Sequence, residues 1–194
     1  MKRACLFILV ALAALLAAPT ALRAQVPAPG ATPTPDPQVY NDPAMHFRAP
    51  NGFYALGQHP VSLENLGDDP QVVAGWVYPD RDHPRKLAIQ IEYYVGDVGG
   101  FDGVLEQQMR DQFETAIFKN KQNTTLKNGM PAMFMEMTSG EGFNVQKGYF
   151  LIWTDGQRGV ALILITQLND VSTETARAIL SDATAVRYPT GRDQ

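Results

Sequence analysis

The residues best suited to hold a metal ion lie in one short segment, Asp80–His83. Its two carboxylates and one imidazole offer the oxygen and nitrogen ligands that hard or borderline divalent cations take. Arginines within and just after the segment compete for the same carboxylates, and a polar hairpin loop commonly has this composition. We therefore interpret the segment as a solvated loop. The alternative is a metal site at Asp80, Asp82 and His83, joined by the acidic pair at 68–69.

Three methionines form a second candidate, because Met133, Met135 and Met137 alternate with Phe134 and Glu136 at the two-residue period of a strand. Thioethers can bind Cu(I), but such a site needs histidine or cysteine nearby, and neither occurs in the C-terminal half of the chain. We predict that the methionines fill a gap between a sheet and a helix. The glutamate on the opposite face then needs a place near the sheet rim or a basic partner.

Four aromatic residues, Trp76, Tyr78, Tyr93 and Tyr94, fall on two predicted neighbouring strands. They could line a surface that binds a small ligand. The alternative is that they are ordinary strand residues, because aromatic side chains favour strands.

No arrangement in the sequence assigns a nucleophile and a base. There is no G-x-S-x-G, H-E-x-x-H or phosphate-loop pattern, and no G-x-G-x-x-G follows a predicted strand. His46 and His59 are isolated in the sequence. We therefore expect no catalysis, no catalytic residues and no cofactor.

The N-terminus has the three parts of a secretory signal peptide, which we place at residues 1–24. Lys2 and Arg3 precede an apolar run from Ala4 to Ala18, and Ala24 ends a small-residue cleavage site. A retained membrane anchor is the alternative, but the run is shorter than the ~20 residues of a spanning helix. Cleavage would leave no cysteine and no integral membrane segment. Export without disulfides favours the periplasm of a Gram-negative bacterium, or secretion.

Composition divides the rest into a Pro-rich disordered leader at 25–37, one globular domain at 38–189 and a flexible tail at 190–194. Without Lys2, Arg3 and Arg23, 13 basic residues oppose 20 acidic ones, a net charge of −7. The basic residues are scattered singly, whereas nucleic-acid binding needs a clustered basic face. Nucleic acid is therefore excluded as a partner.

Periodicity predicts strands and two main helices within the domain. The predicted strands include Met45–Ala49, Gln71–Tyr78, Lys86–Val95, Val145–Thr154 and Arg158–Leu168, and a loop covers Gly57–Pro70. The first helix runs from a cap at Asp102 to about Phe118, and the second from about Thr173 to Ala183. Type I′ turns are predicted at Asn128-Gly129 and Asp155-Gly156.

Two segments, Phe150–Trp153 and Val160–Ile165, are apolar at every position, which predicts strands covered on both faces. Since they lie in hairpins, the sheet is antiparallel and needs a layer on each side. The fold class is therefore α+β. We expect a three-layer α/β/α sandwich with a mostly antiparallel sheet of six to seven strands and one helix on each face.

Two turn motifs, Phe47-x-x-Pro50-x-Gly52-Phe53 and Leu126-x-Asn128-Gly129-x-Pro131-Ala132, together with this element order, resemble the PsbP/Mog-like superfamily. The resemblance covers most of residues 40–188 and implies the same sandwich. It also implies a non-enzymatic binding or assembly role, such as an extrinsic photosystem II subunit or a nuclear Ran-GTPase partner. Many bacterial members are exported proteins of unassigned role. The shared residues belong to turns and core, so no family binding residue is carried over.

The sequence thus predicts an exported, periplasmic, non-catalytic binding or assembly domain whose partner is an unknown protein of the cell envelope. An export signal argues against the nuclear role. The alternative is a carrier of metal or a small ligand, using the Asp80–His83 loop or the aromatic sheet face.

Overall fold

The computed structural model describes residues 36–42, 45–59, 66, 69–78, 87–140, 145–167, 171–181 and 183–185. The chain divides into two compact units, Met1–Asp36 and Pro37–Gln194, and the second contains all the helices and strands described below. The predicted signal peptide, most of the leader and the tail lie outside the described residues. Within the described part, no helix is both long enough and apolar enough to cross a bilayer.

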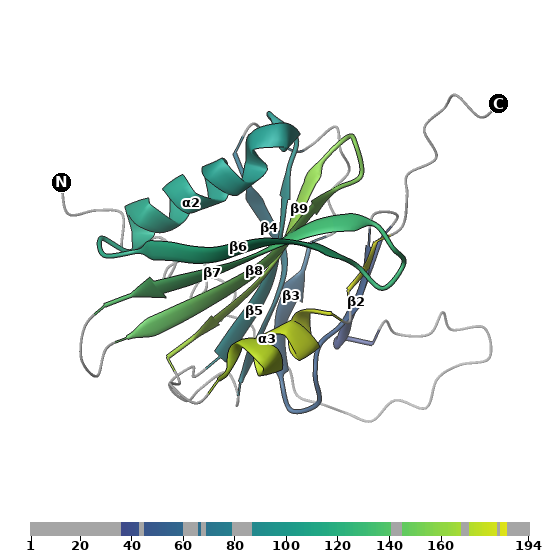
Figure 1. Cartoon of the computed structure of the whole chain (residues 1–194). Coiled ribbons are helices and arrows are strands. Elements are labelled where there is room, and N and C mark those ends of the chain that lie inside the picture. Colours follow the sequence, from purple (N-terminus) through teal and green to yellow (C-terminus); the bar gives the residue numbers. More distant parts are fainter. Residues whose placement is uncertain are drawn as a thin grey trace, which may run out of the picture. The chain divides into compact units, whose positions relative to one another are not determined.

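A seven-stranded sheet forms the centre of the second unit (Figure 1). Its strands are β3 (Tyr54–Gln58), β4 (Gln71–Tyr78), β5 (Leu87–Tyr94), β6 (Ile117–Thr125), β7 (Pro131–Ser139), β8 (Gln146–Thr154) and β9 (Gly159–Thr166). They pair in the order β3-β4-β5-β9-β8-β7-β6, and each neighbouring pair is antiparallel. Strands β3 and β6 are therefore the two edges of the sheet.

The two central strands are buried on both faces, as their unbroken apolar composition predicts. On β9, Val160, Leu162 and Leu164 join one core cluster, whereas Ala161 and Ile163 join the other. All five are completely buried. The α+β fold class and the three-layer arrangement are therefore confirmed.

The first face is covered by a short 3-10 helix, η3 (Val98–Gly100), followed by α2 (Phe101–Gln112). Phe101, Leu105 and Met109 of α2 are buried against this face of the sheet. The fit is close at Gly159, where an added Cβ would lie 2.4 Å from the Phe101 ring. Only glycine leaves room for that ring.

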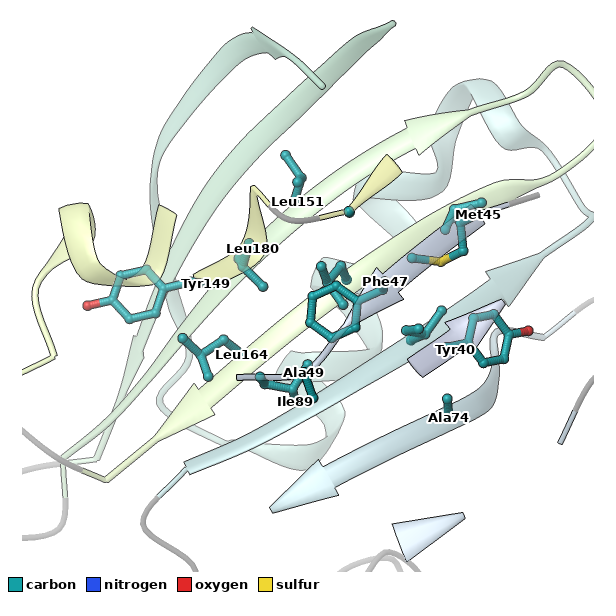
Figure 2. Packing of buried hydrophobic residues seen from close by; sticks show 14 of the residues in the cluster. Tyr40, Met45, Phe47, Ala49, Ala74, Ile89, Tyr149, Leu151, Leu164 and Leu180 are labelled. Atoms are coloured by element: carbon teal, nitrogen blue, oxygen red, sulfur yellow. The ribbon is translucent and has the colours of Figure 1, made fainter. Parts of the chain in front are cut away.

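The second face is covered by a mixed layer rather than by a helix alone. It consists of α3 (Thr173–Leu180) and a three-stranded sheet of β1 (Val39–Asn41), β2 (Met45–Arg48) and β10 (Thr184–Ala185). The predicted strand at 45–49 thus pairs in this small sheet and not in the main one. Figure 2 shows Phe47 of β2 and Leu180 of α3 in one core cluster with Leu164 of β9.

The first long helix is shorter than predicted. It ends at Gln112, because Phe113 takes an extended conformation with φ −128° and ψ 96°, and the segment up to Phe118 enters strand β6. The apolar stripe that we assigned to one helix therefore spans two elements, and Ile117 is 66% exposed. Hydrogen bonding of the β6 backbone to β7 competes with continuation of the helix. Without this pairing, β7 would be an unpaired edge of the sheet.

Neither predicted type I′ turn forms. At the first, Gly129 has φ +81° while Asn128 does not have positive φ, and the Gly129 amide donates to the Leu126 carbonyl at 2.9 Å. This is a three-residue hairpin loop ending in a left-handed glycine. At the second turn, Gly156 has positive φ and Asp155 does not. The Asp155 carboxylate accepts hydrogen bonds from the backbone amides of Gln157 and Arg158. The carboxylate stabilises that turn instead.

The predicted loop at Gly57–Pro70 begins inside a strand, because Gly57 and Gln58 belong to β3. A register shift between Ala55 and Gly57 marks an irregular pairing with β4. An edge strand that is short and interrupted carries a weak sequence pattern. This explains why the alternation did not reveal it.

Candidate functional site

The predicted metal ligands Asp80, Asp82 and His83 lie outside the described residues, as does Asp68. Within the described ranges, no group of three His, Cys, Asp or Glu side chains could hold a metal ion. The described histidines belong to strand contacts. His46 Nδ1 lies 3.4 Å from Asn41 Oδ1, and the His59 amide donates to the Val73 carbonyl.

The four aromatic residues do not form a shared surface, so the interpretation as ordinary strand residues holds and the alternative of a ligand-binding face does not. Trp76 and Tyr93 are completely buried, and Tyr94 is 7% exposed. Trp76 packs edge-on against Phe47, while Tyr94 stacks on Phe101 at 5.0 Å on the opposite face of the sheet. Side chains at 93 and 94 must point to opposite faces because they are adjacent in a strand.

The methionines pack as predicted at two positions. Met135 and Met137 are buried with Leu105 and Met109 of α2, while Met133 is half-buried. Thus the copper interpretation has no exposed thioether pair to support it.

Glu136 lies on the opposite face of β7 and is 8% exposed. Its Oε1 accepts a hydrogen bond from the Thr173 hydroxyl at 3.2 Å, and Lys119 is its cross-strand neighbour. Because β7 pairs with the edge strand β6, Glu136 lies near the sheet rim, as expected.

Glu136 belongs to the face of the sheet that carries α3, and this face is hollowed beside the helix. Helix α3 packs against β8 and β9, so β6 and β7 are less covered. Two hollows lie on this face: Phe134 lines the first, and Glu136, two residues along β7, lines the second.

The first hollow has a volume of about 340 Å³ and an apolar floor with a basic side. The described lining residues are Thr124, Thr125, Leu126, Lys127, Phe134, Leu151, Arg177, Leu180 and Ser181. The Arg177 guanidinium carbon lies 3.8 Å from the centre of the Phe134 ring, and its Nη2 donates to Gln122 Oε1 at 2.8 Å. Arg177 is thus held in place by an aromatic ring and a neutral amide.

The second hollow has a volume of about 450 Å³ and is polar, with charges of both signs. The described charged residues in its lining are Lys119, Lys147, Glu136 and Glu174. Ser172 caps the start of α3 here, since its Oγ accepts from the Thr175 amide at 3.1 Å. The opposite charges in this lining and the Ser172 cap explain why the second hollow is polar, and they require no bound ligand.

A buried ionic network joins the small sheet to the main sheet. Tyr40 and Tyr93 both donate to Asp42 Oδ2, at 2.9 and 2.8 Å. Arg158, 1% exposed, donates through Nε to Asp155 Oδ2 at 3.1 Å and lies over the Tyr93 ring. Burial raises the pKa of both tyrosines well above the usual range, so they remain neutral donors. We assign this network to stability because each of its groups is enclosed.

A buried acid lies under α2. Glu92 of β5 is 0% exposed, and burial raises its pKa to about 7, although hydrogen bonds from Gln108 and Gln90 oppose the shift. Its Oε1 accepts from Gln90 Nε2 at 2.6 Å and from Gln108 Nε2 at 3.5 Å. Its Oε2 has no partner among the described residues, and neither has Gln108 Oε1. When it is protonated, Glu92 can donate a hydrogen bond at this place, where Glu92 Oε2 and Gln108 Oε1 otherwise have no partner among the described residues.

Sequence reasoning missed both Arg177 and Glu92. Arg177 looks like any polar residue of a short amphipathic helix, and nothing in the sequence places it beside Phe134. Glu92 did leave a signal, because the alternation of 87–95 assigns it to the face opposite Ile91. In a sheet covered on both sides, that face is also buried.

Comparisons with known proteins indicate no family. No family model matches the sequence, and no curated protein matches it. A crystal structure from Bacteroides thetaiotaomicron VPI-5482 is similar, with a TM-score of 0.44 and 10% identity over 80% of this chain. The chain spans only 50% of that protein's length. LpqN of Mycobacterium tuberculosis, involved in cell envelope biogenesis, is similar with a TM-score of 0.47, 13% identity, and coverage of 76% of this chain and 87% of LpqN.

Both TM-scores lie below 0.5, so neither likeness indicates a function for this chain. The resemblance to the PsbP/Mog-like superfamily is not confirmed by these comparisons.

Proposed function

We propose that this chain is an exported, non-catalytic binding domain of the bacterial cell envelope, and that it binds its partner on the face of the sheet that carries α3. The observation that carries the proposal is the pair of hollows that are both lined by residues of α3. Binding sites are typically concave, with an apolar lining and a few positioned polar groups. The first hollow has four buried apolar residues at its base and polar or charged residues around them. The N-terminal signal-peptide pattern supports export.

The described serines support a non-catalytic role, because each hydroxyl makes a local structural contact. Ser139 Oγ lies 3.1 Å from Thr115 Oγ1, Ser172 caps α3, and Ser181 donates to the Ala178 carbonyl. In the described part of the chain, none of these hydroxyls is hydrogen-bonded to a histidine that could act as its base.

Photo-crosslinking in the native envelope tests the proposal. A crosslinking amino acid replaces Thr125, an exposed residue that lines the first hollow, or Glu114, an exposed control residue in the turn between α2 and β6. We expect a discrete adduct from position 125 that is absent from position 114, and its loss when Arg177→Gln is added. Adducts from position 114 alone, or none from either position, would refute the assignment of the binding face.

The alternative of a metal carrier at Asp80, Asp82 and His83 stays a prediction, because those residues lie outside the described part of the chain.

A further inference from the structure

The charge lining the first hollow is opposite in sign to that of the protein. The chain has 20 acidic and 16 basic residues, yet the charged residues in the described lining of this hollow are Lys127 and Arg177, with no acid among them. A low-dielectric cleft lined by one sign of charge attracts ligands of the other sign. The hollow therefore favours an anion.

Arg177 differs from a matched arginine on the opposite face. Arg110 of α2 also lies over an aromatic ring, that of Phe118 at 5.1 Å. Its Nη2 donates to Glu106 Oε2 at 3.1 Å and its Nη1 to the Ala116 carbonyl, so its charge is already compensated. Arg177 instead donates to the neutral amide of Gln122.

The described acid nearest to Arg177 along α3 is Glu174, one turn earlier. Hydrogen bonds from its own backbone amide and from Ser172 lower the pKa of Glu174, and Arg177 contributes the smallest part. No ion pair within 4.0 Å joins Arg177 to a carboxylate of the described residues. Most donors of its guanidinium fork are thus left for a ligand, and this fork fits a carboxylate or phosphate in two parallel hydrogen bonds.

The rest of the hollow is apolar at its base. Leu126, Phe134, Leu151 and Leu180 line it and are between 1% and 6% exposed, so they form a fixed surface. A volume of about 340 Å³ is at the small end of ligand pockets. This fits a compact apolar body joined to one anionic group.

We propose that the first hollow binds a small amphiphile, whose carboxylate or phosphate group pairs with Arg177 while its apolar body lies against Leu126 and Leu151. The inference rests on the proposed function, since it uses the same face, and it adds the chemical class of the ligand and the residue that recognises it.

The test measures binding of decanoate and decyl phosphate to the signal-free chain by titration calorimetry, below the micellar concentration of each probe. Decyl maltoside is the uncharged control. We expect saturable binding of both anions that weakens as salt rises. Arg177→Gln should weaken it about tenfold or more, because a charge-assisted hydrogen-bond pair is lost. Arg177→Lys keeps the charge without the planar fork. Its anion affinity should therefore lie between those of the wild type and Arg177→Gln.

Arg110→Gln is the matched control, since it removes a ring-stacked arginine from the other face, and it should leave anion affinity unchanged. Circular dichroism of each variant shows whether it is folded. Equal affinity of wild type and Arg177→Gln, or equal binding of decyl maltoside, would overturn the inference. So would the binding of anionic phospholipid vesicles without binding of the free anions, which would identify a membrane surface instead. If neither anion binds while position 125 still gives its adduct, the ligand class is wrong and the binding face stands.

Discussion

Replacing Glu92 by glutamine is expected to stabilise the protein, and by more at pH 8 than at pH 5. The carboxyl is completely buried between β5 and α2, and its described side-chain contacts are with the neutral amides of Gln90 and Gln108. Its Oε2 has no donor in the described structure. A glutamine has nearly the same shape, carries no charge, and can donate to the Gln108 oxygen that also lacks a partner.

The magnitude follows from the pKa of Glu92, which burial raises from 4.5 to about 7. Because the folded state holds this proton more tightly than the unfolded state, the favourable contribution is complete below pH 4.5. It is lost as the pH rises through 7. At about 1.36 kcal/mol per pKa unit, the free energy of unfolding should fall by about 2–3 kcal/mol between pH 5 and pH 8 through this group.

Urea unfolding at pH 5 and pH 8 provides the assay, for the wild type, Glu92→Gln and the exposed control Glu114→Gln. Other groups also titrate, so the informative quantity is the change with pH in each variant minus that in the wild type. Glu92→Gln should flatten the profile by about 2–3 kcal/mol, whereas Glu114→Gln should follow the wild type. Parallel profiles for wild type and Glu92→Gln, or destabilisation by Glu92→Gln at pH 8, would refute the reasoning.

Further predictions concern core packing and the ionic network. Arg158→Leu should destabilise the protein by about 3–5 kcal/mol in urea unfolding, because it leaves Asp155 as a buried, uncompensated charge; a loss below 1 kcal/mol would contradict this. Gly159→Ala should cost about 1–3 kcal/mol, since its Cβ would overlap the Phe101 ring. Gly103→Ala, on the exposed face of α2 with nothing within 4 Å of the new Cβ, should instead stabilise by up to about 1 kcal/mol. Equal changes in melting temperature for the two glycine variants would contradict the packing argument.

The sequence predicted those parts of the fold in which one local pattern dominates. The apolar runs of β8 and β9 can be satisfied only by cover on both faces, so the three layers follow from them. The end of α2 could not be predicted in this way, because Phe113, Ala116 and Ile117 continue the helical spacing. The pairing of β6 with β7, which involves residues far from the helix, decides that boundary. Such tertiary pairing overrides a local pattern and leaves little trace in it.

The candidate site was harder to predict for a related reason. Its central contact joins Arg177 of α3 to Phe134 of β7 and Gln122 of β6, three residues that only the folded chain brings together. Each is ordinary in its own element. Most of the residues that looked most distinctive in the sequence are buried or lie outside the described part. Distinctive composition was therefore a poor guide to this surface.

The edge strand β6 is joined to the helix on each face of the sheet by a different kind of contact. Toward α2, Lys121 Nζ lies 2.9 Å from Asp102 Oδ2 and also pairs with Glu106, so opposite charges join the helix to the edge. Toward α3, the corresponding bridge is a single hydrogen bond from Arg177 to Gln122. A neutral amide competes with an incoming anion far less than a carboxylate would, because it offers no opposite charge. The face with the weaker bridge is therefore the one on which a ligand can replace a contact at little cost.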